Sequence, residues 1–388
     1  MTKRRFVIIL LLILFLLFAF FSFGLNTARA DELSDNIEQE LENIDLTDLE
    51  KFSEDNLPFE IDFNAFNYIK KLLNGEYDVD FISFLSYIKD VIFGNIFKIL
   101  PILISVIAIA IFSGLIVGIK GNFASDGISD LISIISVCAV IVLLTSLIGG
   151  IFYEVKNTTE NIAKLTEIMS PIILTLMVGS GGIVSAQVYQ PVVLFLSNGI
   201  TQVFCNILIP LVGIMLIFNV LSNFSINLKL KKYNDFLTSL FKWIIGITVT
   251  IFGVFLSVQG ISSATHDGIS IKAAKYTISN SIPLIGGFLK EGFDLILAGS
   301  ILIKNAVGIS GVFILIYMII PPVLFVGITS LLLKLTAAII EPISDGKVSD
   351  FCFSLSKSIS NLAVILLMVS FMFFITVLLM IFSASSFI

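Results

Sequence analysis

Apolar and polar stretches alternate along the chain in blocks of the length needed to cross a membrane. About 20 apolar residues in an α-helix span the ~30 Å hydrocarbon core of a bilayer. Membrane crossings are expected in residues 96–119, 131–152, 241–258, 309–333 and 359–382, with three short ones within 168–224. This pattern predicts an all-α, polytopic transmembrane helical bundle.

The composition agrees with the pattern and narrows the class of protein. Of 388 residues, 57% are hydrophobic and 13% are charged, and the mean hydropathy is +1.04. A soluble fold of this length could not bury so many apolar side chains, so the lipid bilayer is expected to cover the surplus. The three cysteines, Cys138, Cys205 and Cys352, are far apart and serve as small apolar fillers. No metal or cofactor is predicted.

Residues 1–30 read as a signal peptide. A positive stretch with Lys3, Arg4 and Arg5 precedes an apolar core at 6–23, and small residues around Ala30 predict cleavage after that residue. The apolar core is longer than the ~7–15 residues usual for a signal, so an uncleaved anchor is the alternative. Both interpretations place the next segment outside the cytoplasm.

Residues 31–95 form an acidic extracytoplasmic segment. It holds 17 Asp and Glu against four Lys, a net charge of −13, whereas the whole chain has −6. Apolar residues recur between the carboxylates at helical spacing, so short amphipathic helices are expected. The segment is either a docking surface for a basic or apolar partner or a solvated spacer. Its charge disfavours nucleic acid as a partner.

Lysine distribution gives the orientation. Lys229, Lys231 and Lys232, opposed only by Asp235, predict a cytoplasmic loop. Residues 153–167 carry charges of both signs and are expected to form an extracytoplasmic loop. An odd number of crossings must then separate the two, which suits three short ones between 168 and 224.

The N-terminal transmembrane bundle, residues 96–258, contains a glycine-rich helix break. Gly179, Gly181 and Gly182 are poor helix-interior residues, and residues 187–191 are polar enough for a second turn. A tight helical hairpin packed through small residues is the favoured interpretation. A discontinuous helix at a conduction or binding site is the other.

Three amide side chains follow the break. Asn198, Gln202 and Asn206 recur every four residues, so they lie on one face of a helix. They are expected to hydrogen-bond to neighbouring helices or to another subunit, and a water path is the alternative.

Residues 259–311 combine charges, glycines and the single histidine, and precede the C-terminal helices of 312–388. Lys290, Glu291 and Asp294 lie where a spanning segment should be apolar, which favours an amphipathic or re-entrant segment over a crossing at 282–303. Lys290 and Asp294 are spaced to neutralise each other on one helical face. A proton or ion relay is the alternative.

One short motif needs testing as a catalytic site. Gly308 to Gly311 reads G-I-S-G, a pattern found in intramembrane serine proteases, whose serine is activated by a histidine of a neighbouring helix. Here the only histidine, His266, precedes the serine in a polar stretch. Four residues of glycine-rich apolar sequence are weak support, so no catalytic residue is assigned and no enzyme activity is predicted.

The polar and glycine positions of this region also carry a resemblance. GISSATHDGISIKAAKYTISNSIPLIGG at 260–287, SILIKNAVGISG at 300–311 and LTDLEKF at 46–52 resemble the stage III sporulation protein AE family of endospore-forming bacteria. The resemblance brings no catalytic residues.

The resemblance implies a membrane component of the channel-like stage III A assembly between mother cell and forespore, which supports late forespore gene expression. It also implies a place in the mother-cell membrane around the forespore and, as partners, the other stage III A proteins. Composition and spacing alone fit a small-solute or ion transporter equally well, and they leave open whether the chain forms a homo-oligomer.

Overall fold

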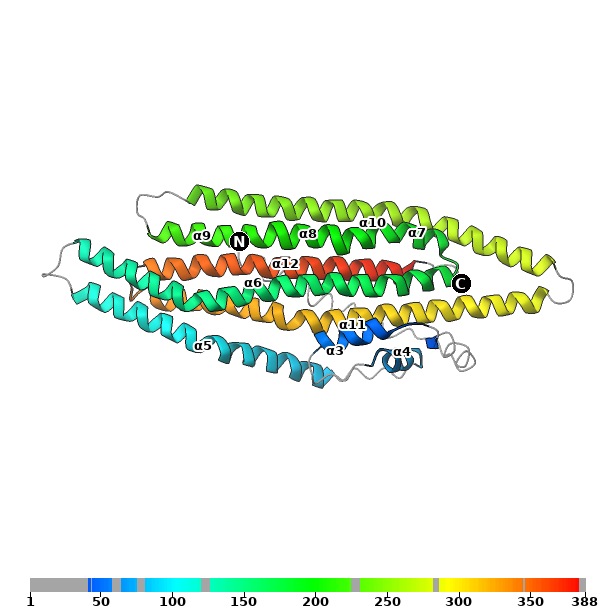
Figure 1. Ribbon diagram of the computed structural model, residues 1–388, viewed down its shortest axis with the longest axis horizontal. Coiled ribbons are helices and arrows are strands. Elements are labelled where there is room, and N and C mark those ends of the chain that lie inside the picture. Colours follow the sequence, from blue (N-terminus) through cyan, green and yellow to red (C-terminus); the bar gives the residue numbers. More distant parts are fainter. Residues whose placement is uncertain are drawn as a thin grey trace.

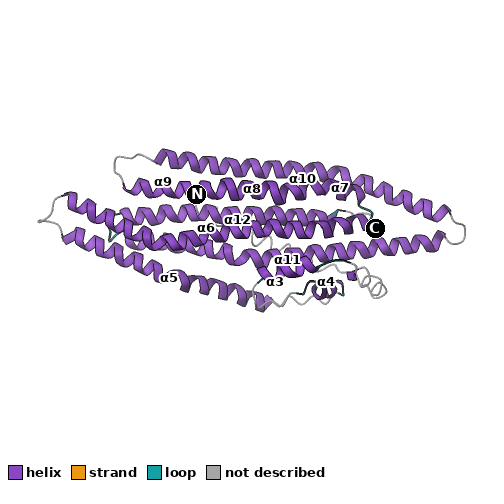
Figure 2. Cartoon of the chain, in the orientation of Figure 1, coloured by secondary structure: helices purple, strands orange, loops and turns teal. Residues whose placement is uncertain are grey.

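The structure is a computed structural model that describes residues 41–42, 44–57, 64–74, 81–119, 126–224, 231–281, 286–344 and 346–383. The signal peptide, with its expected cleavage after Ala30, lies outside these ranges, as do parts of the acidic segment. Throughout the described ranges the regular elements are helices, with no strand among them (Figure 2). The all-α prediction is confirmed.

Two short helices precede the long ones. They are α3 (Thr47–Asn56) and α4 (Ala65–Leu73). The long helices are α5 (Phe81–Ile119), α6 (Asp126–Gly179), α10 (Lys231–Ser281), α11 (Gly286–Ile340) and α12 (Lys347–Phe382). Between α6 and α10 lies a composite helix that has no gap: α7 (Ile183–Leu194), the π-helix η1 (Phe195–Ile200), α8 (Thr201–Val203), the π-helix η2 (Phe204–Leu208) and α9 (Ile209–Phe224).

Six of the described helices are long and apolar enough to cross a membrane, and they lie side by side along the long axis of the molecule (Figure 1). In α12, 67% of the most apolar window is buried inside the bundle, against 17% in α10 and 28% in α5. Large apolar side chains on the outer helices, such as Phe97 and Trp243, are each 69% exposed. A surface of this kind requires lipid, so the molecule is a polytopic membrane protein.

Several helices are far longer than a bilayer is thick. With 54, 51 and 55 residues, α6, α10 and α11 are each about 76–83 Å long, more than twice the ~30 Å hydrocarbon core. Each therefore has room for a membrane crossing and for a part that projects from the membrane. This length explains why charged residues occur inside continuous helices.

The prediction of an extracytoplasmic loop at 153–167 is wrong, because these residues belong to the helix α6. Val155, Thr159, Ile162 and Thr166 are buried at helical spacing, whereas Lys156 is exposed. The charges occupy only one face of the helix. The other face packs on the bundle, so the helix continues through the charged stretch.

The three short crossings expected between 168 and 224 are also wrong. The composite helix runs without interruption from residue 183 to 224, and the polar residues at 187–191 make no turn. Gln187 and Gln190 are exposed, while Ser185, Ala186 and Tyr189 face the bundle. Polarity here again marks one face of a helix, and the chain turns only at residues 180–182.

The described part of 282–303 does not form the expected re-entrant hairpin either. α10 continues to Ser281, and from Gly286 a single helix, α11, continues to Ile340 with Pro321 and Pro322 inside it. Residues 286–303 are therefore the first part of α11. Charges are tolerated there because a helix of this length extends past the bilayer core.

The turns between the long helices lie toward two opposite ends of the molecule, whereas α5 begins near its middle (Figure 1). At one end, the Ile343 carbonyl lies so close to Gly114 that a Cβ built there would be 2.1 Å from its oxygen. At the other, the Ser383 hydroxyl lies 3.8 Å from the Met177 sulfur. The antiparallel helices thus place the end of α12 toward the same end as the turn after α6.

The described part of the acidic segment packs onto this bundle. The side-chain amide of Asn161 on α6 donates a 2.6 Å hydrogen bond to the side-chain carbonyl of Asn56 at the end of α3. On α4, the Tyr68 ring lies 4.8 Å, centroid to centroid, from Phe313 of α11. Helices α3 and α4 are therefore attached to the bundle along one side.

Candidate interaction surface

The only interruption between α6 and the composite helix is a tight turn built on Gly181. Its φ of +83° is a left-handed conformation that favours glycine. The Gly182 N–H donates to the Met177 carbonyl at 2.8 Å and the Gly181 N–H to the Val178 carbonyl at 2.9 Å. These two bonds form a Schellman motif, which ends α6 with its last carbonyls satisfied.

The first turn of α7 is capped by a residue far away in sequence. Asp267 of α10 is fully buried. Its two carboxylate oxygens accept the backbone N–H groups of Val184 and Ser185 at 2.9 and 3.0 Å, and one of them also accepts the Ser185 hydroxyl. Since Gly182 offers no side chain, Asp267 performs the role of an N-cap residue.

α10 therefore fixes the whole turn. One helical turn after Asp267, Ile271 packs against Gly181 so closely that a Cβ there would lie 2.7 Å from its Cγ1 atom. The sequence places the helix break at Gly179, Gly181 and Gly182, and in the structure α6 ends at Gly179 and α7 starts at Ile183. The break is a turn between two antiparallel helices at one end of the bundle.

A second buried charge lies near the same end. Lys304 of α11 is fully buried, and its ammonium group donates to the Ser383 carbonyl just after α12. A cation at a helix C-terminus is stabilised by the carbonyl groups that point toward it. Neither Asp267 nor Lys304 was predicted from the sequence as a site residue. The isolation of Lys304 in a mostly apolar stretch was a signal, whereas Asp267 lies in a polar one. Their partners, 79 and 82 residues away, were not predictable from spacing.

The ion pair expected between Lys290 and Asp294 is replaced by another. Lys275 of α10 lies 2.7 Å from the Asp294 carboxylate, nitrogen to oxygen, with the two side chains 26% and 41% exposed. Lys290 and Glu291 are exposed on α11. Because α10 and α11 are antiparallel neighbours at this level, a lysine from the facing helix reaches Asp294.

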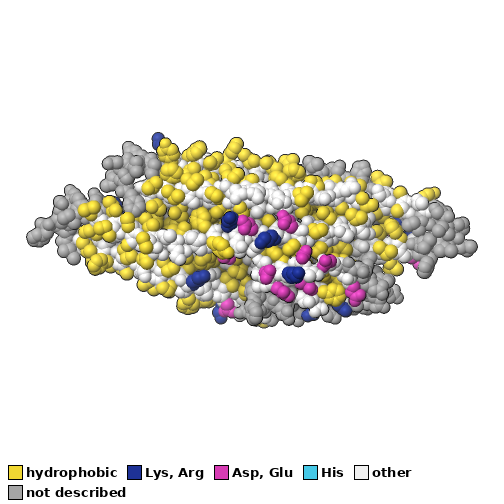
Figure 3. All heavy atoms as spheres, viewed as in Figure 1, with side chains coloured by type: hydrophobic (Ala, Val, Ile, Leu, Met, Phe, Trp, Pro, Cys, Tyr) yellow, Lys and Arg dark blue, Asp and Glu magenta, His cyan; other side chains and the backbone are white. Residues whose placement is uncertain are grey.

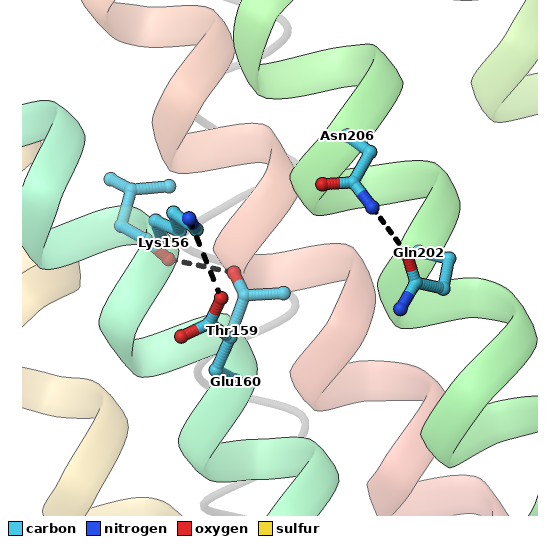
Figure 4. A network of polar contacts seen from close by, with 6 residues as sticks. Lys156, Thr159, Glu160, Gln202 and Asn206 are labelled. Atoms are coloured by element: carbon cyan, nitrogen blue, oxygen red, sulfur yellow. Dashed lines mark hydrogen bonds and ion pairs between the residues drawn. The ribbon is translucent and has the colours of Figure 1, made fainter.

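The three amides of the composite helix lie on its outer surface. Asn198, Gln202 and Asn206 are all exposed. The Asn206 amide donates to the Gln202 carbonyl one turn away (Figure 4), and the Asn198 amide makes a 3.4 Å contact with the Ser197 hydroxyl. We refer to Asn198, Gln202 and Asn206 as the amide seam.

The two π-helical segments straighten this seam. In a regular α-helix a spacing of four advances by about 40° per step, so Asn198 and Asn206 would lie about 80° apart. Phe195–Ile200 and Phe204–Leu208 are π-helical. Their hydrogen bonds reach back five residues, and this slower winding counters the drift. The amides thereby share one exposed line along the helix.

Charged residues of α6 lie beside the seam. Lys156 and Glu160 form an exposed i, i+4 pair at 3.8 Å, on the α6 turns that face η2 and α8 (Figure 4). On the face shown in Figure 3, charged side chains gather over the middle of α6 and over α3 and α4. The amide seam, the α6 charges and the acidic helices thus form one polar zone on this face of the molecule.

The G-I-S-G motif has a packing role. The buried Ser310 hydroxyl donates to the Val307 carbonyl of its own helix at 2.7 Å. Added Cβ atoms at Gly308 and Gly311 would lie 2.5 Å from Ile381 and 2.4 Å from Met169. The glycines let α11 approach α12 and α6. The side chain of His266 lies outside the described residues. Nowhere in the described ranges do three His, Cys, Asp or Glu side chains gather as a metal site.

Comparison with known proteins shows which family the chain resembles. A family model described as stage III sporulation protein AE matches residues 63–384. The chain is 33% identical over 238 residues to stage III sporulation protein AE of Bacillus subtilis (strain 168). That alignment spans 61% of this chain and 60% of the relative. No solved structure matches the chain.

Proposed function

The chain belongs to the stage III sporulation protein AE family, and from this premise we propose that it is a membrane component of the channel-like stage III A assembly between mother cell and forespore. Its role in sporulation follows from the family. The finer proposal adds a location, the mother-cell membrane around the forespore. It also adds partners, the other stage III A membrane proteins.

The observation that carries this proposal is the amide seam on the outside of an apolar bundle. The composite helix that bears it has the length and hydropathy of a membrane span. An amide facing hydrocarbon without a hydrogen-bond partner costs several kcal/mol. Hydrogen bonds between membrane helices return about 0.6–2 kcal/mol each. An exposed line of three amides therefore favours a protein neighbour over lipid.

The alternative function, a small-solute or ion transporter, relied on the glycine break and on Lys290 with Asp294. The break is a capped turn at the end of the bundle, and Asp294 pairs with Lys275. Both features thus have a structural explanation. No described residue adds a specific reason to prefer transport, so the assembly role is the function proposed.

Co-purification from sporulating cells tests the proposal. We expect the tagged chain to retain the other stage III A membrane proteins, and the Gln202→Leu/Asn206→Leu variant to lose most of them, because its surface no longer offers amide groups. The matched control is Thr145→Val/Thr250→Val, which removes two exposed hydroxyls elsewhere on apolar helices. It should behave as the unaltered chain does.

Two results would count against the proposal. If the unaltered chain purifies without any stage III A protein, membership of the assembly is refuted. If the seam variant retains its partners and the cells sporulate normally, the seam is not the surface that binds them. Equal abundance of all variants in the membrane fraction must accompany either conclusion.

A further inference from the structure

We propose that the amide seam binds the seam of a second copy of this chain, with the two composite helices parallel in one membrane. This inference rests on the proposed function only in taking the seam as a protein interface. It adds that the protein bound at the seam is a second copy of this chain.

Hydrogen-bonding capacity is the first argument. An amide side chain has two N–H donors and a carbonyl acceptor. The contact within the chain uses one Asn206 donor and the Gln202 carbonyl, so the Gln202 N–H groups and the Asn206 carbonyl are available at the surface. Donors of one copy can meet acceptors of an identical copy, and a two-fold axis repeats each such bond.

Charge is the second argument. The seam holds no ionised group, and the adjacent Lys156–Glu160 pair is balanced within one chain. Two identical surfaces of this composition do not repel each other, as two like-charged surfaces would. The contact needs no partner of opposite charge, which an acidic or basic seam would have required.

Shape and apolar flanks are the third argument. The π segments keep the amides in one line. Large apolar side chains continue the exposed surface of the helix on both sides of the seam, among them Leu194 (56% exposed), Ile207 (49%) and Ile214 (44%). Such a surface packs along its length on a straight partner helix. Copies inserted in one membrane share one orientation, so a two-fold contact places each seam residue opposite its own equivalent.

Site-specific disulfide formation tests this arrangement in full-length protein. Cys138, Cys205 and Cys352 are first replaced by alanine, and single cysteines are then introduced as Asn198→Cys, Gln202→Cys or Asn206→Cys. Copper phenanthroline is the oxidant, applied to membranes in which this chain is expressed without other sporulation proteins. A disulfide requires Cα atoms within about 7 Å, so only close equivalents can react.

We expect each seam cysteine to form a covalent dimer with its own equivalent. The matched control is Ile104→Cys on α5, which is 56% exposed on a different helix and should stay monomeric. A mixture of differently tagged Asn198→Cys and Asn206→Cys chains should give little mixed dimer, since these residues are about 12 Å apart along a helix. Efficient mixed dimer would mean an antiparallel contact and would overturn the parallel arrangement.

The remaining outcomes separate this inference from the proposed function. If seam cysteines give no dimer, but after labelling with benzophenone-4-maleimide they cross-link under light in sporulating cells to a protein of another size, the partner is a different protein and only this inference fails. If they cross-link to nothing in either membrane, the seam is no interface. In that case the co-purification experiment alone decides whether the chain belongs to the assembly.

Discussion

Asp267 on α10 accepts a hydrogen bond from the backbone N–H group of Val184. The two residues are 83 positions apart in the chain. Nothing in the local sequence of Asp267 points to that partner. Helix N-termini leave N–H groups without partners, and a buried end must find an acceptor from somewhere. Here the turn consists of Ser180, whose hydroxyl donates to the Met177 carbonyl of α6 at 2.9 Å, and of two glycines without side chains. The acceptor for the first turn of α7 therefore comes from a neighbouring helix.

Removing this acceptor should weaken the bundle measurably. Asp267→Ala leaves two backbone N–H groups and the Ser185 hydroxyl without their partner, and we expect a loss of about 1–3 kcal/mol in the free energy of unfolding. Asp267→Asn keeps one side-chain oxygen and should lose less. The measurement is SDS-induced unfolding of the purified chain in mixed micelles, followed by circular dichroism.

Asp235→Ala on the same helix is the matched control, because Asp235 is exposed. It should unfold as the unaltered chain does. Equal behaviour of Asp267→Ala and Asp235→Ala would show that the cap contributes nothing to stability.

At the scale of whole helices, the sequence predicts the type of element well and its bounds poorly. Periodic apolar residues identify helices, and six of the described ones have the length and hydropathy of membrane spans. The errors all occur where polar residues interrupt the apolar pattern: 153–167, 187–191 and 282–303. Polarity on one helix face and polarity of a loop look alike in sequence until it is known which face is covered.

At the candidate interaction surface, too, the helical type and the shared face were predictable from the sequence, and the packing was not. The spacing of Asn198, Gln202 and Asn206 was enough to place them on one face, but their exposure and the π segments depend on how the composite helix packs. Likewise, the i, i+4 spacing predicted a Lys290–Asp294 pair, although Lys275 from another helix makes the contact. Local geometry predicts local neighbours only, whereas pairing between helices is a property of the fold.

The Lys275–Asp294 contact can be tested as an interaction between elements. Because both side chains are partly exposed, we expect a coupling energy of about 0.2–1 kcal/mol from a double-mutant cycle of Lys275→Ala and Asp294→Ala. The charge-exchanged variant Lys275→Asp/Asp294→Lys should recover most of it. Unfolding in detergent at low ionic strength gives the four free energies.

Lys290→Ala provides the comparison, because Lys290 is spaced to pair with Asp294 along α11 but is exposed. It should change stability by less than about 0.5 kcal/mol. Coupling of Lys290 to Asp294, with none between Lys275 and Asp294, would restore the pairing along one helix and refute the pairing between helices.

For the molecule as a whole, the count of crossings decides the orientation of every surface. Six antiparallel helices with the length and hydropathy of crossings place the turn between α6 and the composite helix and the end of α12 toward one end, and the turn between α11 and α12 toward the other (Figure 1). The helix α5 begins near the middle of the molecule and runs toward this second end (Figure 1). The start of α10, with Lys231 and Lys232, belongs to this second end, which positive-inside bias assigns to the cytoplasm. The exported side would then hold α3, α4 and the capped turn at Gly181.

Single introduced cysteines in a cysteine-free chain test this orientation. Lys232→Cys and Glu341→Cys, at the proposed cytoplasmic end, should react with a membrane-impermeant maleimide only after the cells are opened. Gln187→Cys and Ser270→Cys, at the opposite end, should react in intact protoplasts. All four side chains are exposed, so a difference in reactivity reports the side of the membrane and not burial. Reaction of both Lys232→Cys and Glu341→Cys from outside would mean that the bundle has the opposite orientation. Reaction of only one of the two from outside would refute the six-crossing arrangement, since these positions would then lie on different sides of the membrane.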